Sequence, residues 1–247
     1  MKIVISKDAD ILGKKAASFI SWKLNEAVRI NGEARLLVST GASQFEMFEN
    51  LVLEDVPWQK IEVFHLDEYI GLPVTHPASF RKYLNERFIS NVDVKKFHSI
   101  DVEDDISSVI GKLTEEIRRK PVDIGIIGIG VNGHIAFNDP PADFETRESY
   151  IKVKLDNVCK TQQVNEGWFK SAREVPEFAV SMSVFQIMQC RTIVSCVPHK
   201  VKADAIYNMF MRRLTNMVPA TILKKHPDYH LYLDYQSASR IIKFEEE

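Results

Sequence analysis

Short apolar runs alternate along the chain with longer segments in which apolar residues recur every three or four positions. The runs KIVIS (2–6), RLLVS (35–39) and IEVFHL (61–66) are typical of buried strands. Between them, residues 9 to about 28 and the segment from about Gln44 have helical spacing. This order predicts an α/β three-layer sandwich, in which helices cover both faces of a mostly parallel, Rossmann-like sheet.

The second half of the chain keeps the same alternation. The runs VDIGIIGIG (122–130), RTIVSCV (191–197) and YHLYLD (229–234) predict further strands, and residues 200–214 predict a helix. A helix within residues 102–118 is predicted by apolar residues that share one face: Val102, Ile106, Val109, Ile110, Leu113 and Ile117.

No repeat, low-complexity linker or change of composition divides the chain, so we predict one domain over residues 1–247. The stretch from about 140 to 172 is its least regular part, being polar and interrupted by Pro140 and Pro141. In parallel α/β sheets, ligands bind beyond the carboxyl ends of the strands. We therefore interpret residues 140–172 as a lid over a ligand site.

The composition of the chain argues against some classes of binding partner. The chain has 32 basic and 34 acidic residues without a long run of one sign, which disfavours binding to nucleic acids or anionic membranes. We find neither a signal-peptide pattern nor the roughly 20 apolar residues that span a bilayer. The 3 cysteines lack C-x-x-C spacing, so neither a disulfide framework nor a zinc site is indicated. We expect a soluble, cytoplasmic protein that acts on a small molecule.

Three polar segments follow predicted strands and could converge on one site. The first is STGAS (39–43), which lies between a strand and a helix. Small residues allow a ligand close to the backbone, and the amides of a helix N-terminus attract an anion such as phosphate. The alternative is a tight turn in which Ser43 serves only as the helix N-cap.

The second segment is LDEYIGLP (66–73), where Asp67 and Glu68 end an apolar strand. A carboxylate at that place would be partly desolvated, which raises its pKa and suits a general base at neutral pH. The alternative is that one acid caps a loop while the other faces solvent.

The third segment is DIGIIGIGVNGHIAFNDP (123–140), in which Gly128, Gly130 and Gly133 spell G-x-G-x-x-G. A dinucleotide fingerprint requires a helix to open at the third glycine. Pro140 and Pro141 forbid a long helix there, so we reject NAD or FAD binding. The loop instead presents polar side chains at a strand end, and a histidine near a carboxylate can act as a protonatable acid. These side chains are Asn132, His134, Asn138 and Asp139.

Taken together, these segments resemble the glucosamine-6-phosphate deaminase (isomerase) family, whose superfamily also holds the 6-phosphogluconolactonases. The most specific matches are LDEYIGLPVTHPASF (66–80) and GIGVNGHIAFNDP (128–140). The similarity continues through VPEFAVSMS (175–183), PHKVKADAI (198–206) and VPATILKKHPD (218–228), and so spans nearly the whole chain.

The resemblance implies that an amino sugar phosphate isomerises and loses ammonia to give fructose-6-phosphate, without a metal or an organic cofactor. It makes Asp67 the base that moves a proton between C2 and C1 of the opened sugar. His134 would open the ring with Asp139 as its carboxylate partner, and Asn132 stands where many members carry Asp. The substrate- and phosphate-binding residues implied are Thr40, Gly41, Ala42, Ser43, Glu68, Gly133 and Lys202.

The chain also departs from the family pattern. Asp139 is one methylene shorter than the Glu of many members, and Gly167 stands where a lid arginine is expected. Lys160 and Arg173 are candidate replacements for that arginine. The allosteric residues of some members are not recognisable, so we expect no regulation.

Three alternative functions stay open. The galactosamine epimer is a second candidate substrate, because few contacts read C4 of the sugar. A 6-phosphogluconolactonase is disfavoured, because NGHIAFNDP differs from the loop of those enzymes. A non-catalytic sugar-phosphate sensor would not need the acid and base residues, and here Asp67 and His134 are both present. A homo-oligomer remains open as well.

Overall fold

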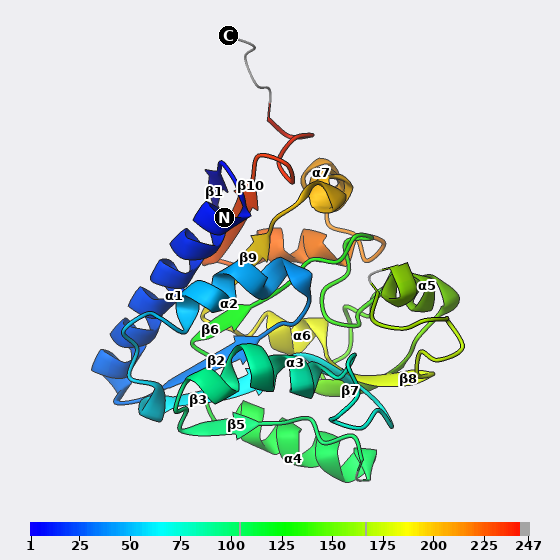
Figure 1. Cartoon of the computed structure of the whole chain (residues 1–247), viewed down its shortest axis with the longest axis horizontal. Helices are drawn as coiled ribbons and strands as arrows, with labels where there is room; N and C mark the ends of the chain where they lie inside the picture. Colours follow the sequence, from blue (N-terminus) through cyan, green and yellow to red (C-terminus); the bar gives the residue numbers. More distant parts are fainter. Residues whose placement is uncertain (104, 166, 243–247) are drawn as a thin grey trace.

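A seven-stranded parallel sheet forms the centre of the fold (Figure 1). The computed structural model describes residues 1–103, 105–165 and 167–242. Every pair of neighbouring strands in this sheet is parallel, which confirms the predicted sheet. In spatial order the strands are β1 (Lys2–Ser6), β10 (Tyr229–Asp234), β9 (Thr192–Val197), β6 (Ile124–Ile126), β2 (Ala34–Val38), β3 (Ile61–His65) and β5 (Lys96–His98).

Helices cover both faces of this sheet, as its buried strands require. Adjacent strand residues point to opposite faces, and in β2 Leu36 belongs to one hydrophobic cluster while Leu37 belongs to the other. The cluster of Leu36 takes in α1 (Ala9–Asn31), α2 (Phe45–Leu51) and α3 (Phe80–Arg87), and that of Leu37 takes in α4 (Ile106–Arg118), α6 (Val184–Ile187) and α7 (Ala203–Met211).

The ends of the helices follow from local side-chain chemistry. At the start of α1 the Asp8 carboxylate accepts the Ile11 amide at 2.9 Å. The helix ends at Gly32, whose φ of +79° is a left-handed conformation that favours glycine. Asp105 caps α4 in the same way, so Val102 precedes the helix although it packs in the same cluster. None of the helices in the described ranges is long and apolar enough to cross a bilayer.

A second, antiparallel sheet lies beside the first and was not predicted. Its strands are β4 (Asp67–Tyr69), β8 (Phe178–Met182) and β7 (Tyr150–Lys154), with β8 in the middle. The segment that we interpreted as an irregular lid therefore contains β7, followed by the helix α5 (Asn157–Asn165). Figure 1 shows α5 set apart from the helices that cover the central sheet.

Short 3-10 helices complete the connections, and the two that matter for the site follow strands of the central sheet. They are η1 (Ala42–Gln44), η2 (Trp58–Lys60), η3 (Ile89–Asn91), η4 (Lys200–Lys202) and η5 (Pro219–Lys225), of which η1 follows β2 and η4 follows β9.

The three cysteines are buried, and none forms a disulfide. Cys190 lies two residues before β9, Cys196 lies within that strand, and Cys159 lies in α5. Burial raises the pKa of Cys190 to about 12, so its thiol stays protonated at neutral pH.

Candidate active site

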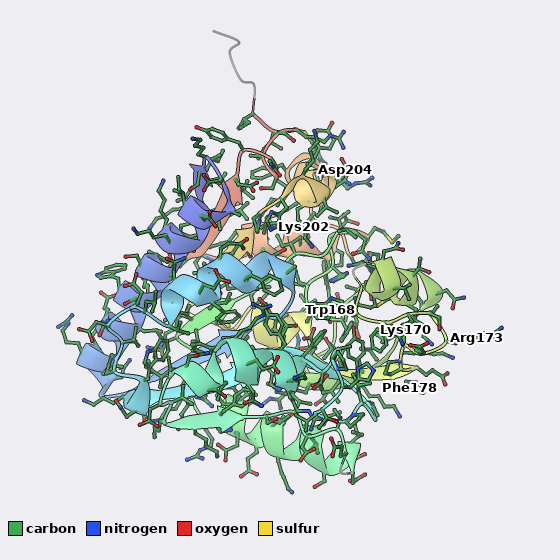
Figure 2. The ribbon with its side chains drawn as sticks, in the orientation of Figure 1. Trp168, Lys170, Arg173, Phe178, Lys202 and Asp204 are labelled. Atoms are coloured by element: carbon green, nitrogen blue, oxygen red, sulfur yellow. The ribbon has the colours of Figure 1, made fainter. Side chains whose placement is uncertain are left out.

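A cavity of about 840 Å³ opens at the carboxyl ends of β2, β3, β6 and β9. This is the place where parallel α/β sheets bind ligands. Helix α5 and the residues after it form a further wall. Figure 2 labels two residues that line the cavity: Trp168, after α5, and Lys202, before α7. The residues predicted from the sequence that line it are Thr40, Gly41, Ala42, Ser43, Asp67, Asn132, His134 and Lys202.

Asp67 is held by both sheets. It follows β3 after one residue, and as the first residue of β4 it pairs with Ser181 of β8. Its side chain lines the cavity, yet the residue is only 7% exposed. Burial, with a further contribution from the neighbouring Glu68 charge, raises the pKa of Asp67 well above its ordinary value. The residue therefore has the environment expected of a general base.

Glu68 turns away from the cavity, because neighbouring strand residues point in opposite directions. Its carboxylate accepts the Ser79 hydroxyl at 2.9 Å and the Arg81 amide at 2.8 Å, at the start of α3. The Arg81 guanidinium lies 3.3 Å away, and both side chains are buried. The structure thus does not bring Glu68 to the substrate site, where we had expected it. It anchors α3 instead.

Asn132, His134 and Asp139 form a connected group. The Nδ1 atom of His134 lies 3.1 Å from Oδ1 of Asp139, which is ion-pairing distance. The amide of Asn132 donates to the same oxygen at 3.0 Å, and its own oxygen accepts the His134 backbone amide at 3.0 Å. The shorter carboxylate therefore still reaches the imidazole directly. Asn132 orients both partners without a charge.

Two forces act on Asp139. Burial raises its pKa, but hydrogen bonding and charge attraction from His134 act in the opposite direction, and with its other hydrogen bonds they bring the pKa below its ordinary value. Asn132 and the Cys159 thiol of α5 contribute further hydrogen bonds in the same direction. Asp139 is consequently ionised at neutral pH and does not itself line the cavity.

Glycine is required at two positions of this loop, for a different reason at each. A Cβ at Gly130 would overlap the imidazole ring of His134, so glycine is needed for the ring to lie against the backbone. Gly133 has φ +84°, and a Cβ there would lie 2.8 Å from Cγ1 of Val218. Its carbonyl accepts the Ala220 amide at 2.8 Å. Gly133 therefore packs against η5 and does not reach the cavity, although we had expected it among the substrate-binding residues.

All four residues of the segment Thr40–Ser43 line the cavity. Gly41 has φ +101°, which favours glycine, and its carbonyl accepts the Tyr83 hydroxyl at 2.9 Å. Gln44, not Ser43, precedes α2, and no side chain caps that helix. Ser43 thus does not serve as the N-cap. Of the described residues that line the cavity, Lys202 is the only lysine or arginine.

Sequence reasoning missed a set of neutral and aromatic residues in the cavity wall. The amide side chains of α5 could not be predicted to line a site, because the helix lacks a clear amphipathic pattern. Trp168, which follows the helix, belongs to no sequence motif that we recognised. His199, at the end of β9, could have been found from its position after a strand. The candidate lid cations Lys160 and Arg173 do not line the cavity. Figure 2 shows Arg173 at the outer edge of the molecule.

Among the described residues, no group of three or more His, Cys, Asp or Glu side chains is arranged to hold a metal ion. The cavity instead brings together a buried carboxyl group, a histidine with a carboxylate partner, a lysine and the small residues of Thr40–Ser43. Such a set can transfer protons and bind an anion.

Comparisons with known proteins place this arrangement in a known group. Residues 7–231 match the family described as glucosamine-6-phosphate isomerases/6-phosphogluconolactonase. The glucosamine-6-phosphate deaminase of Thermoanaerobacter pseudethanolicus is 32% identical, over 98% of this chain and 95% of that protein. The glucosamine-6-phosphate deaminase of Clostridium novyi is 33% identical, over 98% of this chain and 100% of that protein.

Solved structures agree with the sequence matches. A monomeric glucosamine-6-phosphate deaminase superposes with a TM-score of 0.88 and is 27% identical, covering 97% of this chain and 99% of that chain. The 6-phosphogluconolactonase of Thermotoga maritima superposes with a TM-score of 0.78 at 16% identity, covering 94% of this chain and 98% of that chain. The second likeness shows the fold alone.

Proposed function

Because the chain belongs to the family of glucosamine-6-phosphate isomerases and 6-phosphogluconolactonases, we propose that it converts glucosamine-6-phosphate and water to fructose-6-phosphate and ammonia. The observation that carries the proposal is the meeting of Asp67 and the His134–Asp139 pair in one cavity. The chemistry requires proton transfer at two places on the sugar, and these groups supply an acid/base residue for each.

The first step is opening of the sugar ring. His134 gives a proton to the ring oxygen as the bond between that oxygen and C1 breaks, and it then takes up the proton that the C1 hydroxyl loses, which yields the open aldehyde. Asp139 holds the imidazole in place from 3.1 Å and balances the charge that forms on it. Asn132 fixes the orientation of both groups through its two 3.0 Å hydrogen bonds.

The second step is the isomerisation. The Asp67 carboxylate takes the proton from C2, and the electron pair left on carbon forms a C1=C2 double bond. The substrate ammonium gives a proton to the former aldehyde oxygen, which completes the enolamine. Return of the proton to C1 gives an iminium ion at C2. Water then adds to C2 and ammonia leaves, which completes the ketone of fructose-6-phosphate. The raised pKa of Asp67 favours this proton uptake, because a more basic carboxylate is the better proton acceptor.

The phosphate is the third group to be bound. We propose that the backbone amides of Thr40–Ser43 and the Lys202 ammonium hold it, since the amides that open a helix and a lysine together attract an anion. We also propose that the 140–172 segment acts as a lid, with α5 as its mobile part. These steps need no metal or organic cofactor. They fit a cytoplasmic hydrolase of amino sugar metabolism that serves the catabolism of N-acetylglucosamine.

A direct assay tests the proposal. Purified protein is incubated separately with glucosamine-6-phosphate, galactosamine-6-phosphate and 6-phosphogluconolactone, and ammonia and fructose-6-phosphate are measured. We expect ammonia and fructose-6-phosphate in equal amounts from glucosamine-6-phosphate. Release of ammonia from the galactosamine epimer alone would change the substrate, and lactone hydrolysis without ammonia release would overturn the proposal.

A further inference from the structure

His199 has a backbone conformation that residues with side chains avoid. Its φ is +75° and its ψ is +147°, a region that only glycine enters without strain. Among the non-glycine residues of the described ranges, only Ala136 shares a positive φ. A glycine at position 199 would relieve the strain. The histidine therefore costs the folded protein free energy at this position, which suggests that its side chain has a function.

The strained backbone is fixed from both sides. The His199 amide donates to Oδ2 of Asp234 at 2.9 Å, and the His199 carbonyl accepts the Lys202 amide at 3.0 Å. Asp234 is buried at the end of β10, and its other oxygen accepts the Ser237 amide at 2.6 Å. The His199 backbone, from which the imidazole extends, is therefore fixed by the central sheet.

The side chain lies at the same end of the cavity as the proposed phosphate site. His199 and Lys202 both line the cavity. Gln44, next to the Thr40–Ser43 segment, donates to the Cys196 carbonyl at 3.3 Å and so ties that segment to the end of β9. Nε2 of His199 lies 3.8 Å from a carboxylate oxygen of Glu46, in the first turn of α2. The imidazole thus points toward the start of α2, the helix that follows the segment.

We propose that His199 is a further phosphate-binding residue, whose ring N–H donates a hydrogen bond to an oxygen of the substrate phosphate. This inference rests on the proposed function and extends its phosphate site. It gives a reason for the strained backbone, because that backbone places a third donor beside the amides and Lys202. The competing explanation is that His199 serves only to pair with Glu46 and stabilise the fold.

The variant His199→Gly separates the two explanations in the full chain. We expect KM for glucosamine-6-phosphate to rise about tenfold while kcat changes less than about twofold, because a lost hydrogen bond to a charged group weakens binding by that order. The thermal midpoint should stay within about 3 °C of wild type, because glycine suits this backbone. His199→Asn keeps a side-chain N–H donor at the same strained position, so it should recover part of the KM.

Lys200→Ala is the matched control, because Lys200 is an exposed neighbour that does not line the cavity. It should leave KM unchanged. An unchanged KM in His199→Gly would overturn the inference, as would an equal loss of kcat/KM with unphosphorylated glucosamine. A lower thermal midpoint with unchanged KM would support the competing explanation.

A binding measurement keeps this inference distinct from the proposed function. If wild-type protein fails to deaminate glucosamine-6-phosphate, the proposed function fails. The inference is then read from NMR of the histidine rings while inorganic phosphate is added. The ring signal that is missing from His199→Gly should shift on addition of phosphate, and an unmoved signal would overturn the inference.

Discussion

Asp67 meets two opposing demands. Burial makes its carboxyl group more basic, which serves proton abstraction, but burial also makes the ionised form costly in the folded protein. A group with a raised folded-state pKa contributes its stability at low pH and loses it as the pH rises through that pKa. The catalytic form of the residue is therefore the form that the fold tolerates less well.

Replacing Asp67 by Asn should separate these demands. Turnover should fall by about 10²–10⁴-fold, the range that a general base contributes. Asn cannot ionise, so the variant should gain free energy of unfolding relative to wild type as the pH rises. Activity assays and urea unfolding at pH 5 and pH 8 give both quantities. Near-normal turnover would remove Asp67 as the base, and a stability difference that does not grow with pH would contradict its burial as a charge.

Gly130 offers a second test at this scale. In Gly130→Ala the new methyl group would displace the His134 imidazole, so we expect kcat to fall by at least about tenfold while the fold is retained. Gly128→Ala is the control, because its Cβ would lie 3.6 Å from the nearest side-chain atoms, which is ordinary contact. Steady-state kinetics with circular dichroism distinguish the two, and equal losses in both variants would show that the ring position is not the cause.

Residues at strand ends could be predicted as site candidates, and others could not. Asp67, His134 and Asp139 follow apolar runs, so the parallel sheet places them at one edge. Glu68 has the same neighbours in sequence, and only the strand geometry decides that it faces α3 and not the cavity. His199 follows a predicted strand, so its place near the site could have been predicted, but its positive φ could be found only from the structure.

At the scale of elements, α3 depends on one buried ion pair. Glu68 and Arg81 are both shielded from water, and the same carboxylate binds the amides that open the helix. Arg81 also reaches the exposed carboxylates of Asp101 and Glu103, each at 3.2 Å. Loss of Glu68 would therefore leave the guanidinium only partly compensated.

We expect Glu68→Gln to lower the free energy of unfolding by about 3 kcal/mol, the lower end for breaking a buried pair. The thermal midpoint should fall by about 6–12 °C. The control is Glu86→Gln, which removes the exposed partner of Lys82 on the same helix and should cost less than about 0.5 kcal/mol. Thermal unfolding measures both, and similar small losses would mean that the pair does not anchor α3.

The strands of the central sheet could be predicted, but the small sheet could not. Central strands are buried on both faces and give continuous apolar runs. β4 has 3 residues, which is too short to show a pattern. β7 (YIKVK) does alternate apolar and basic residues, but over only 5 residues within the polar stretch that we interpreted as an irregular lid. Helix α5 is likewise marked by polar residues that a loop would also contain.

At the scale of the whole molecule, the cavity lies between the central sheet and α5, and residues of both line it. The Cys159 thiol of the same helix bonds the carboxylate of Asp139. A ligand that fills the cavity should therefore order α5 and stabilise the folded chain.

Fructose-6-phosphate at about 100 times its Kd should add about 2.7 kcal/mol of stability, which raises the thermal midpoint by about 5–10 °C. Amide hydrogen exchange within residues 157–165 should slow at the same time. Unphosphorylated fructose at the same concentration is the control and should do neither. An equal shift with fructose would contradict recognition through phosphate, and unchanged exchange in α5 would contradict its role as a lid.

The order of the strands is a property that the sequence alone did not supply. β10, the last strand of the chain, lies between β1 and β9. Periodicity identifies strands one at a time, whereas their order depends on which crossovers pack best over the whole sheet. The general location of the site still followed, because all parallel strands end at the same edge.

The three buried thiols differ in how they could become exposed to solvent, and this difference makes movement of α5 measurable. Cys190 and Cys196 belong to the core around β9, but Cys159 is covered only where α5 meets the rest of the fold. Each outward excursion of α5 would bring Cys159 briefly within reach of an alkylating reagent. The rate of Cys159 alkylation, followed by mass spectrometry without any engineered label, would then report how often α5 opens. Saturation with fructose-6-phosphate should lower that rate.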